Sequence, residues 1–558
     1  SLLLLSLNPL IDNEDKQNED NIGLLHLDRS KLSLKNSNDW SASGSAANPA
    51  VLRSVDTSPS NEIVVSGVIS GSTTMTLGST SITSGQYIEP WIAKADANGN
   101  WQWIQKVSIT GTSQYAEATV QDISVAPNGD IFATGMFYDT ISFGSITLTS
   151  TGYWDCWTAK LSSSGQWQWA QALRGNGDYD GVTVTTLDVV YGTSITTDSN
   201  SNPVVGGWFL GNTDVGVAAD TGAQDGTDIE VFVAKYGNSG NLQWTEVARG
   251  QGSQEINTMT VDTNNDIWVA TTFEVSMTFG SVVANAGINE IPMGIARISQ
   301  SGTWQSAYAT TGSGQPLATD FTMDDQNNLL MSGFYTGSIN LGSQLTSSGQ
   351  NDAFIASMNP SGSWNWAESV GGSSYDAGSG VEYDSNTGYA ILGLYSQSSF
   401  NFGSQTFNTR GFNDSVVVTF TSNGNPVALF DAGSSLDDAI TGISLMPNGA
   451  LVVAGNYNGT IDFGSSSAGS QSTSVLIPYV GAILVHPDTS NMPMEFSQRD
   501  KTAGIESEAF WVSFNTFDDN LNYQSFEVTP AGAIADMYSS GDFDPQNDYD
   551  YDTVFEGY

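Results

Sequence analysis

The side chains best suited to chemistry are carboxylates and tyrosines in short glycine- and serine-rich segments that precede apolar strands. A carboxyl pair can perform general acid and base steps, as in glycoside hydrolysis, and grouped carboxylates can collect cations. A solvated acidic rim is the alternative reading, because acidic residues are common throughout the chain. The candidates for a ligand-binding rim are Tyr115, Glu117, Asp178, Asp180, Glu255, Tyr375, Asp376, Asp437 and Asp438.

Two turn sequences space oxygen ligands two residues apart, as short Ca²⁺ loops do. They are DSNSN, with Asp198, Asn200 and Asn202, and DTNND, with Asp262, Asn264 and Asp266. Both lack the glycine and the distal glutamate of an EF-hand loop. Asp and Asn also form hairpin turns by bonding to their own backbone. Turn formation is therefore the favoured interpretation, Ca²⁺ is the alternative, and no other cofactor is expected.

Tryptophans recur in a sequence motif that follows a glycine turn, as in SGQWQWAQALRG from Ser164 to Gly175. Tryptophans two apart share one face of a strand, so they form either a sugar-stacking platform or a packing surface against a neighbouring element. Repetition at equivalent positions favours packing. The tryptophans assigned a structural role are Trp40, Trp101, Trp103, Trp167, Trp169, Trp244, Trp304, Trp364 and Trp366.

Other catalytic groups are scarce. The two histidines, His26 and His486, have no metal-ligand spacing, and the chain lacks a Gly-x-Ser-x-Gly nucleophile motif. The single cysteine, Cys156, stands in YWDCW where other units have Ala or Val, which predicts a buried small side chain. Together these features predict a protein that is not an enzyme.

The composition narrows the class of partner. The chain has 558 residues, with 15 Lys and Arg against 59 Asp and Glu, for a net charge of −44. Such a surface disfavours nucleic acid and anionic membranes. No apolar run is long enough for a transmembrane helix, and one cysteine forms no intrachain disulfide. An extracellular or cell-surface location is the expectation.

The elements that position these residues are repeats. Each unit reads as an apolar strand, a tight turn, a second apolar strand, a Phe-Gly-Ser corner, a third strand, a glycine turn and a tryptophan strand. The unit recurs at intervals of about 60–70 residues, and four strands per repeat indicate a β-propeller blade. The corner glycines are Gly78, Gly144, Gly216, Gly280, Gly342, Gly403 and Gly464.

The segments AGSSLDDAITGISLMPNGALVVAG, from Ala432 to Gly455, and GGSSYDAGSGVEYDSNTGYAILG, from Gly371 to Gly393, resemble the bacterial and archaeal SBBP β-propeller repeat. The resemblance covers roughly residues 51–485 and implies a propeller fold. It implies little about function, because such repeats serve as scaffolds in many secreted and surface proteins. The family's usual Phe-Pro after the second strand is replaced here by Phe-Gly-Ser.

The predicted fold is therefore all-β, a β-propeller of four-stranded blades, with seven blades favoured over eight. In the eight-bladed alternative the last blade is split between the termini. The predicted domains are an N-terminal arm over 1–38, partly apolar, the propeller over 39–486, and a β-rich extension with an acidic tail over 487–558. The repeats are placed near 51–110, 111–175, 176–250, 251–308, 309–370, 371–431 and 432–486.

The ends of the chain leave several readings open. The run Leu2–Leu7 reads either as the remnant of a signal peptide or as an assembly arm. Trp40 stands where a tryptophan strand would precede the first unit, which makes residues 24–44 a candidate outer hairpin for another blade. The segment Ser490–Phe496 is an alternative source of the last blade's fourth strand.

Three functions are compatible with this sequence. The favoured one is a non-enzymatic extracellular structural or interaction protein, a subunit of a larger assembly held through residues 1–38 and 487–558. The second is a carbohydrate-binding or adhesive propeller. The third is a glycan-active enzyme with channel carboxylates, in which Glu117 or Asp376 would be required for turnover.

Overall fold

A computed structural model describes the part of the chain that forms the repeats. The described residues are 40–43, 45–46, 50–175, 188–216, 220–221, 229–286, 291–457, 461–462, 467–468, 477–484, 512–517 and 523–528. They divide into two units, of which Trp40–Val485 contains the repeats. The other unit contributes one described hairpin, β43 (Val512–Phe517) with β44 (Tyr523–Val528). Over these residues the structure has no helix able to cross a membrane.

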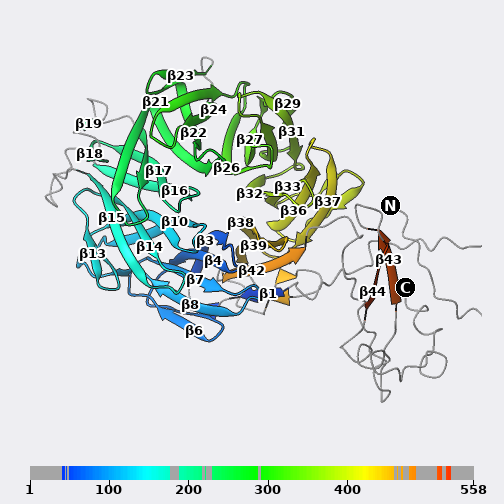
Figure 1. Cartoon of the computed structure of the whole chain (residues 1–558), viewed down its shortest axis with the longest axis horizontal. Coiled ribbons are helices and arrows are strands. Elements are labelled where there is room, and N and C mark those ends of the chain that lie inside the picture. The colour runs from blue at the N-terminus through cyan, green and yellow to red at the C-terminus, as the bar shows by residue number, and fades with distance from the viewer. Residues whose placement is uncertain are drawn as a thin grey trace, which may run out of the picture. The chain divides into compact units, whose positions relative to one another are not determined.

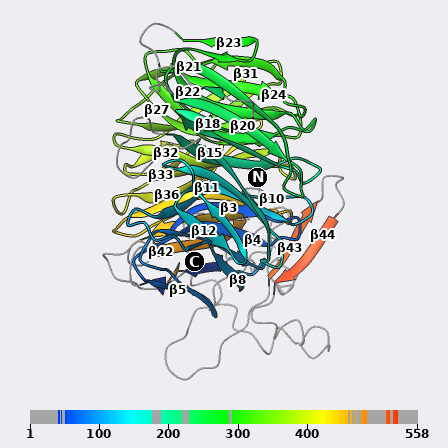
Figure 2. The ribbon, with the colours of Figure 1, turned by 90° about the vertical axis from the view of Figure 1, so that its left-hand side faces the viewer.

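The unit Trp40–Val485 is a β-propeller, as predicted. Its antiparallel sheets follow one another around a ring (Figure 1), which Figure 2 views from the side. Counted over the described residues, strand pairing gives seven blades of four strands. The first three blades are β3 (Ala50–Thr57), β4 (Ile63–Ile69), β7 (Glu89–Ala95) and β8 (Trp101–Lys106); β10 (Glu117–Val125), β11 (Ile131–Tyr138), β14 (Asp155–Leu161) and β15 (Trp167–Gly175); and β16 (Val189–Thr197), β17 (Pro203–Leu210), β20 (Glu230–Tyr236) and the first part of β21 (Leu242–Val261).

The remaining blades follow the same order, from the channel outward. They are the second part of β21 with β22 (Ile267–Phe279), β24 (Met293–Ile298) and β25 (Trp304–Ala309); β26 (Gln315–Met323), β27 (Leu329–Thr336), β30 (Asp352–Met358) and β31 (Trp364–Val370); β32 (Asp376–Asp384), β33 (Tyr389–Ser396), β36 (Asp414–Thr421) and β37 (Pro426–Ala432); and β38 (Asp438–Leu445), β39 (Ala450–Tyr457), β42 (Ile477–Leu484) and β1 (Trp40–Ser43).

Short accessory strands decorate the blades between the second and third strands. At the Phe-Gly-Ser corners, β5 (Thr74–Leu77) pairs with β6 (Thr80–Thr83), β12 (Thr140–Phe143) with β13 (Ile146–Thr149), β22 with β23 (Val282–Asn285), β28 (Ser338–Asn340) with β29 (Gln344–Thr346), and β34 (Phe400–Phe402) with β35 (Gln405–Phe407). Further short strands are β2 (Ser45–Ala46), β9 (Ser108–Ile109), β18 (Asn212–Asp214), β19 (Asp220–Thr221), β40 (Ile461–Asp462) and β41 (Ser467–Ala468).

The hydrophobic core lies between blades rather than within any one of them. Val64 and Ile92 of the first blade share a cluster with Trp157 of the second, and all three side chains are fully buried. Both faces of each sheet are therefore covered, which explains why the middle strands read as continuous apolar runs. Burying a large apolar side chain contributes about 1.5–3 kcal/mol, so the blades stabilise each other cooperatively.

The ring is closed by the N-terminal strand. In β1, Trp40 pairs with Ala482 and Ser43 with Tyr479 of β42, so residues from the start of the repeats complete the last blade. The first and last blades also meet near the channel, since the backbone N–H of Leu52 on β3 donates to Oδ1 of Asn456 on β39 at 2.8 Å. The candidate segments 24–39 and Ser490–Phe496 lie outside the described residues, as do Leu2–Leu7.

Four of the recurring tryptophans bind their blade to the next one: Trp103, Trp169, Trp244 and Trp366. The indole Nε1 of Trp103 donates to the carbonyl of Ser163 at 3.3 Å, and that of Trp366 donates to the carbonyl of Ser422 at 2.8 Å. Each of these four rings covers the turn glycine of the following blade, as Trp103 covers Gly165, whose φ is +78°. The other rings lie against the corner glycine of their own blade; they are Trp101, Trp167, Trp304 and Trp364. The side chains are half-buried, so these tryptophan pairs do not form an open sugar platform.

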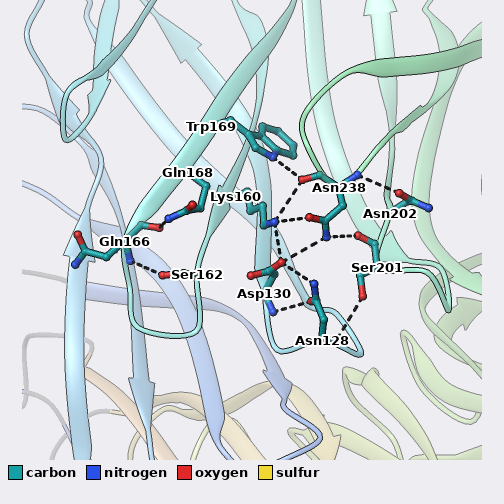
Figure 3. A network of polar contacts seen from close by, with 10 residues as sticks. All are labelled: Asn128, Asp130, Lys160, Ser162, Gln166, Gln168, Trp169, Ser201, Asn202 and Asn238. Atoms are coloured by element: carbon teal, nitrogen blue, oxygen red, sulfur yellow. Dashed lines mark hydrogen bonds and ion pairs between the residues drawn. The ribbon is translucent and has the colours of Figure 1, made fainter.

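Figure 3 shows one such junction, between the second and third blades. Trp169 donates through Nε1 to the carbonyl of Asn238 at 2.9 Å. Lys160 reaches Oδ1 of the same asparagine at 2.5 Å and forms an ion pair of 2.7 Å with Asp130. The amide of Asn238 donates in turn to the carbonyl of Ser201 at 2.8 Å. The position of the turn is thus fixed by polar contacts as well as by packing.

Candidate functional site

The innermost strands line a central channel, and each of the seven has a register shift against its neighbour at the corresponding place. A β-bulge adds one unpaired residue and re-aims its side chain, and such bulges are frequent near functional sites. The seven bulge residues are polar, and all line a channel cavity of about 330 Å³. This set, called the bulge ring, is Arg53, Gln121, Thr193, Asn257, Thr319, Ser379 and Thr441.

Four carboxyl groups lie in the channel next to the bulge ring, and each links two adjacent blades. Asp56, Asp122, Asp320 and Glu382 accept backbone N–H groups from the inner strand of the following blade. The donors are Val125 at 2.7 Å, Ile195 at 2.8 Å, Val381 at 2.9 Å and Leu445 at 3.1 Å, respectively. The geometry gives these channel carboxyls a role in holding the blades together.

The channel raises the pKa of these carboxyls. Burial deep in the ring raises the pKa of Asp320 to about 7 and that of Asp56 to about 6, although backbone hydrogen bonds oppose the shift. Burial and the charges of Asp320 and Asp56 raise the pKa of Glu382 well above its ordinary value. The pKa of Asp122 is also raised, chiefly by burial.

These shifts predict that the propeller loses stability as the pH rises. The folded state holds the Asp320 proton more tightly than the unfolded state, whose pKa is 3.8. The stabilisation is therefore complete below about pH 4 and is lost as the pH rises through about 7. Each unit of pKa shift corresponds to about 1.4 kcal/mol. We expect the free energy of unfolding by urea to fall between pH 4 and pH 8.

The variant Asp320→Asn tests the origin of this pH dependence. An amide does not titrate, so the fall in unfolding free energy between pH 4 and pH 8 should be smaller than in the unmodified protein. Phe321 and Val381 donate to different oxygens of Asp320, and asparagine replaces one of these oxygens with an NH2 group, so the variant should be less stable at pH 5. Glu274→Gln, at an exposed position, is the control. An unchanged pH slope in Asp320→Asn would exclude Asp320 as the titrating group.

An aromatic cleft lies between the first two blades. It has a volume of about 350 Å³ and is formed by the segments before β7 and β10, the end of β11 and the two residues before β14. The hydroxyl of Tyr87 donates to the carbonyl of Ser113 at 2.9 Å, which ties two of these segments together. The residues that define the aromatic cleft are Tyr87, Tyr115, Glu117, Tyr138, Tyr153 and Trp154.

A track of aromatic rings leads from this cleft to the channel. Ring centroids are 5.7 Å apart between Tyr138 and Tyr153, and 4.9 Å between Tyr153 and Trp154. Trp154 lies 6.5 Å from Tyr191. Tyr191 stacks on Trp208 at 5.1 Å with an interplanar angle of 4°.

The end of the aromatic track touches the bulge ring. Nε2 of Gln121 donates to the Tyr191 hydroxyl at 2.5 Å. Contacts between side chains therefore link the aromatic cleft to the bulge ring, with stacking rings at one end and hydrogen-bonding groups at the other.

Glu117 is the carboxyl group of the aromatic cleft. It begins β10 and is half-buried. Burial raises its pKa, while a hydrogen bond from the Trp154 side chain opposes the shift. A carboxyl with a raised pKa next to stacking rings can both accept hydrogen bonds and deliver a proton.

The predicted rim residues do not form one surface. Tyr115, which is 62% exposed, and Glu117 meet in the aromatic cleft. Asp376 and Asp438 are fully buried, which corrects their placement on a solvated rim. Their carboxylates accept the backbone N–H groups of Gly372 and Ser434 and so close the turn before their own strand.

The other rim candidates lie apart from the cleft. Tyr375 is 43% exposed, and Glu255 is exposed on β21. Oδ1 of Asp437 accepts from the side-chain amide of Asn413 at 2.5 Å. Asp178 and Asp180 lie outside the described residues, as do His26 and His486.

The candidate Ca²⁺ turns use their carboxylates for other contacts. Asp198 accepts the backbone N–H groups of Asn200 and Asn202 at 2.9 Å and pairs with Lys235 at 2.9 Å. Burial alone would raise the pKa of Asp198, but Lys235 and Asn202 outweigh it and lower the pKa.

The second of these turns has the same design. Asp262 accepts the backbone N–H groups of Asn264 and Asp266 and forms an ion pair of 2.5 Å with Arg297. A cationic side chain stands in both turns where a metal ion would be needed. No group of three metal-ligating side chains occurs among the described residues.

Cys156 is fully buried on β14. Burial raises the pKa of its thiol to about 12, so the thiolate that a nucleophile requires is scarce at neutral pH.

Sequence reasoning missed most of the aromatic track and the whole bulge ring. Tyr153 and Trp154 directly precede Asp155 in YWDCW, and other units have no aromatic pair at this point. This difference from the other repeats was the signal available in the sequence. Tyr191 and Trp208 belong to different strands, and their stacking depends on the register of β16 against β17. The bulges leave no local mark in the alternation of the strands.

Comparisons with known proteins give the fold but no family. No protein-family model matches the chain, and no curated protein sequence matches it. Its fold is similar to a catalytically inactive virginiamycin B lyase from Staphylococcus aureus, at 10% identity and a TM-score of 0.38, over 79% of this chain and 99% of that one. An ulvan lyase is similar at 9% identity and a TM-score of 0.38, over 73% and 92%. A puromycin hydrolase is similar at 11% identity and a TM-score of 0.30, over 74% and 58%.

These similar structures are enzymes, which contradicts the expectation of a non-enzymatic structural or interaction protein. The physical reason is that a four-stranded repeat specifies a scaffold, and the same scaffold carries catalytic sites in other proteins. At these identities and TM-scores the likeness is one of fold and assigns no reaction to this chain.

Proposed function

We propose that this protein recognises an oligosaccharide on the aromatic cleft and at the channel mouth. The observation that carries the proposal is the continuous track from Tyr138 through Trp154 to Tyr191, which ends on Gln121 of the bulge ring. Sugar rings present an apolar face that packs on aromatic rings, and hydroxyls that need polar partners. The track supplies the first kind of contact and the bulge ring the second.

The surroundings of the track support this chemistry. Tyr153, Trp154, Tyr191 and Trp208 are all half-buried, so part of each ring is accessible. The bulge ring adds two amides, four hydroxyls and one guanidinium from seven different strands. A concave site with stacking faces and a few convergent polar groups is the usual form of a small-ligand site.

The variant Trp154→Ala tests the proposal by titration calorimetry against a panel of oligosaccharides. We expect the unmodified chain to bind at least one of them, and Trp154→Ala to weaken that binding at least about tenfold, which corresponds to about 1.4 kcal/mol. Phe412→Ala is the matched control, because Phe412 is 63% exposed and lies on another blade. Binding to no saccharide, or equal binding by Trp154→Ala, would reject the proposal.

A second candidate function is acid-assisted cleavage of the bound glycan. It is favoured by Glu117, whose pKa is raised by burial within the aromatic cleft. The expected result is release of new reducing ends by the unmodified chain and none by Glu117→Gln. A panel that yields no product with the unmodified chain removes this candidate and leaves recognition standing.

A further inference from the structure

The aromatic cleft has one carboxyl group among the side chains that line it. Glu117 is that side chain, and the other lining groups are tyrosines, a tryptophan, two glutamines and small apolar residues. Partial burial makes an isolated carboxylate unfavourable, and the raised pKa of Glu117 reflects this. A cationic group placed beside it would restore the charged form.

The aromatic rings around Glu117 also favour a cation. Tyrosine and tryptophan faces attract cations within about 6 Å of the ring centroid, and the attraction is worth more where water is excluded. Tyr138, Tyr153 and Trp154 are inclined to one another by 35° and 49°, so their faces do not form one flat platform. Inclined faces with a carboxylate between them suit a rounded cation better than a planar anion.

The net charge of the whole protein also favours a cationic ligand. A net charge of −44 attracts cations to its clefts and repels anions. No lysine or arginine is among the residues that line the aromatic cleft.

From these three observations we propose that the cleft selects saccharides that carry a free amino group, with the ammonium held between Glu117 and the rings of Tyr153 and Trp154. This inference rests on the proposed function and names its substrate class. An uncharged sugar gains only the stacking contacts, and an acidic sugar is opposed by Glu117.

Two oligosaccharides of equal length test this inference. The probes are the tetramer of glucosamine and the tetramer of N-acetylglucosamine, titrated at pH 6.5 in low and in physiological salt. We expect the glucosamine tetramer to bind at least about tenfold more tightly, which corresponds to about 1.4 kcal/mol. Salt should weaken its binding but hardly affect the acetylated tetramer.

Two matched variants locate the preference. Glu117→Gln should remove the preference for the amino sugar, whereas Glu274→Gln, which removes the same charge from an exposed site on another blade, should keep it. A preference that survives in Glu117→Gln would mean general attraction to the acidic surface and would overturn the inference. Equal or tighter binding of the acetylated tetramer would overturn it too, while Trp154-dependent binding would still uphold the proposed function. If neither tetramer nor any other saccharide of the panel binds, both this inference and the proposed function are rejected.

Discussion

A chain that lacks residues 1–43 will unfold at a much lower urea concentration than a chain that lacks residues 1–38. The shorter deletion keeps β1, and the longer one removes it from the edge of β42. Four residue pairs of the ladder are then lost, and the backbone groups of β42 are left unpaired at a sheet edge. At about 0.5–1.5 kcal/mol for each net hydrogen bond, the expected loss is about 2–6 kcal/mol.

The comparison between the two deletions isolates the closing strand, because both chains lack the same preceding residues. The loss of β1 should also promote self-association, since an exposed strand edge pairs readily with another chain. Unfolding followed by fluorescence and light scattering would measure both effects. Equal unfolding midpoints would show that β1 is not needed to hold the ring closed.

A methyl group at Gly165 should destabilise the junction between the first two blades far more than the same change at a similar turn. An ideal Cβ at Gly165 would lie 2.7 Å from Cδ2 of Trp103, and its φ is +78°. At Gly129, φ is +84°, but the nearest atom to such a Cβ is 3.8 Å away. Backbone strain costs about 1–2 kcal/mol at both sites, and overpacking adds about 1–3 kcal/mol at Gly165 only.

Gly129→Ala is thus the control for Gly165→Ala, because the two changes impose nearly the same backbone strain. The difference between their unfolding free energies measures the contact of the tryptophan with the next blade. The double variant Gly165→Ala with Trp103→Ala should recover part of the loss, since the space is then open. Equal losses at the two glycines would contradict the role of Trp103 as a contact between blades.

The sequence-based predictions succeeded where each repeat carried the same local signal. The Phe-Gly-Ser corner, the glycine turns and the tryptophan strand together predicted four-stranded blades, and the structure has them. Localisation and the proposed assembly through residues 1–38 and 487–558 stay predictions. So does the SBBP resemblance, because nothing observed tests that family.

The candidate site was harder to predict because carboxyl groups one residue apart in the repeat have different surroundings. Asp376 and Asp438 lie three residues before the bulge of their inner strand, whereas Glu117 lies four residues before the bulge of β10. Successive side chains of a strand point to opposite faces, so Glu117 lines the aromatic cleft while both aspartates are buried. The offset is measured from the bulges, and their place depends on the register between strands.

The sequence by itself determined the blade, because strand length, turn residues and the spacing of apolar side chains are local properties. Only the tertiary structure decided which aromatic side chains are available to a ligand. The ring closes the second tryptophan of each pair against the next blade, and a bulge at the same place in every inner strand turns one polar residue into the channel. Both effects depend on contacts between strands of different blades or on their register, which no local pattern encodes.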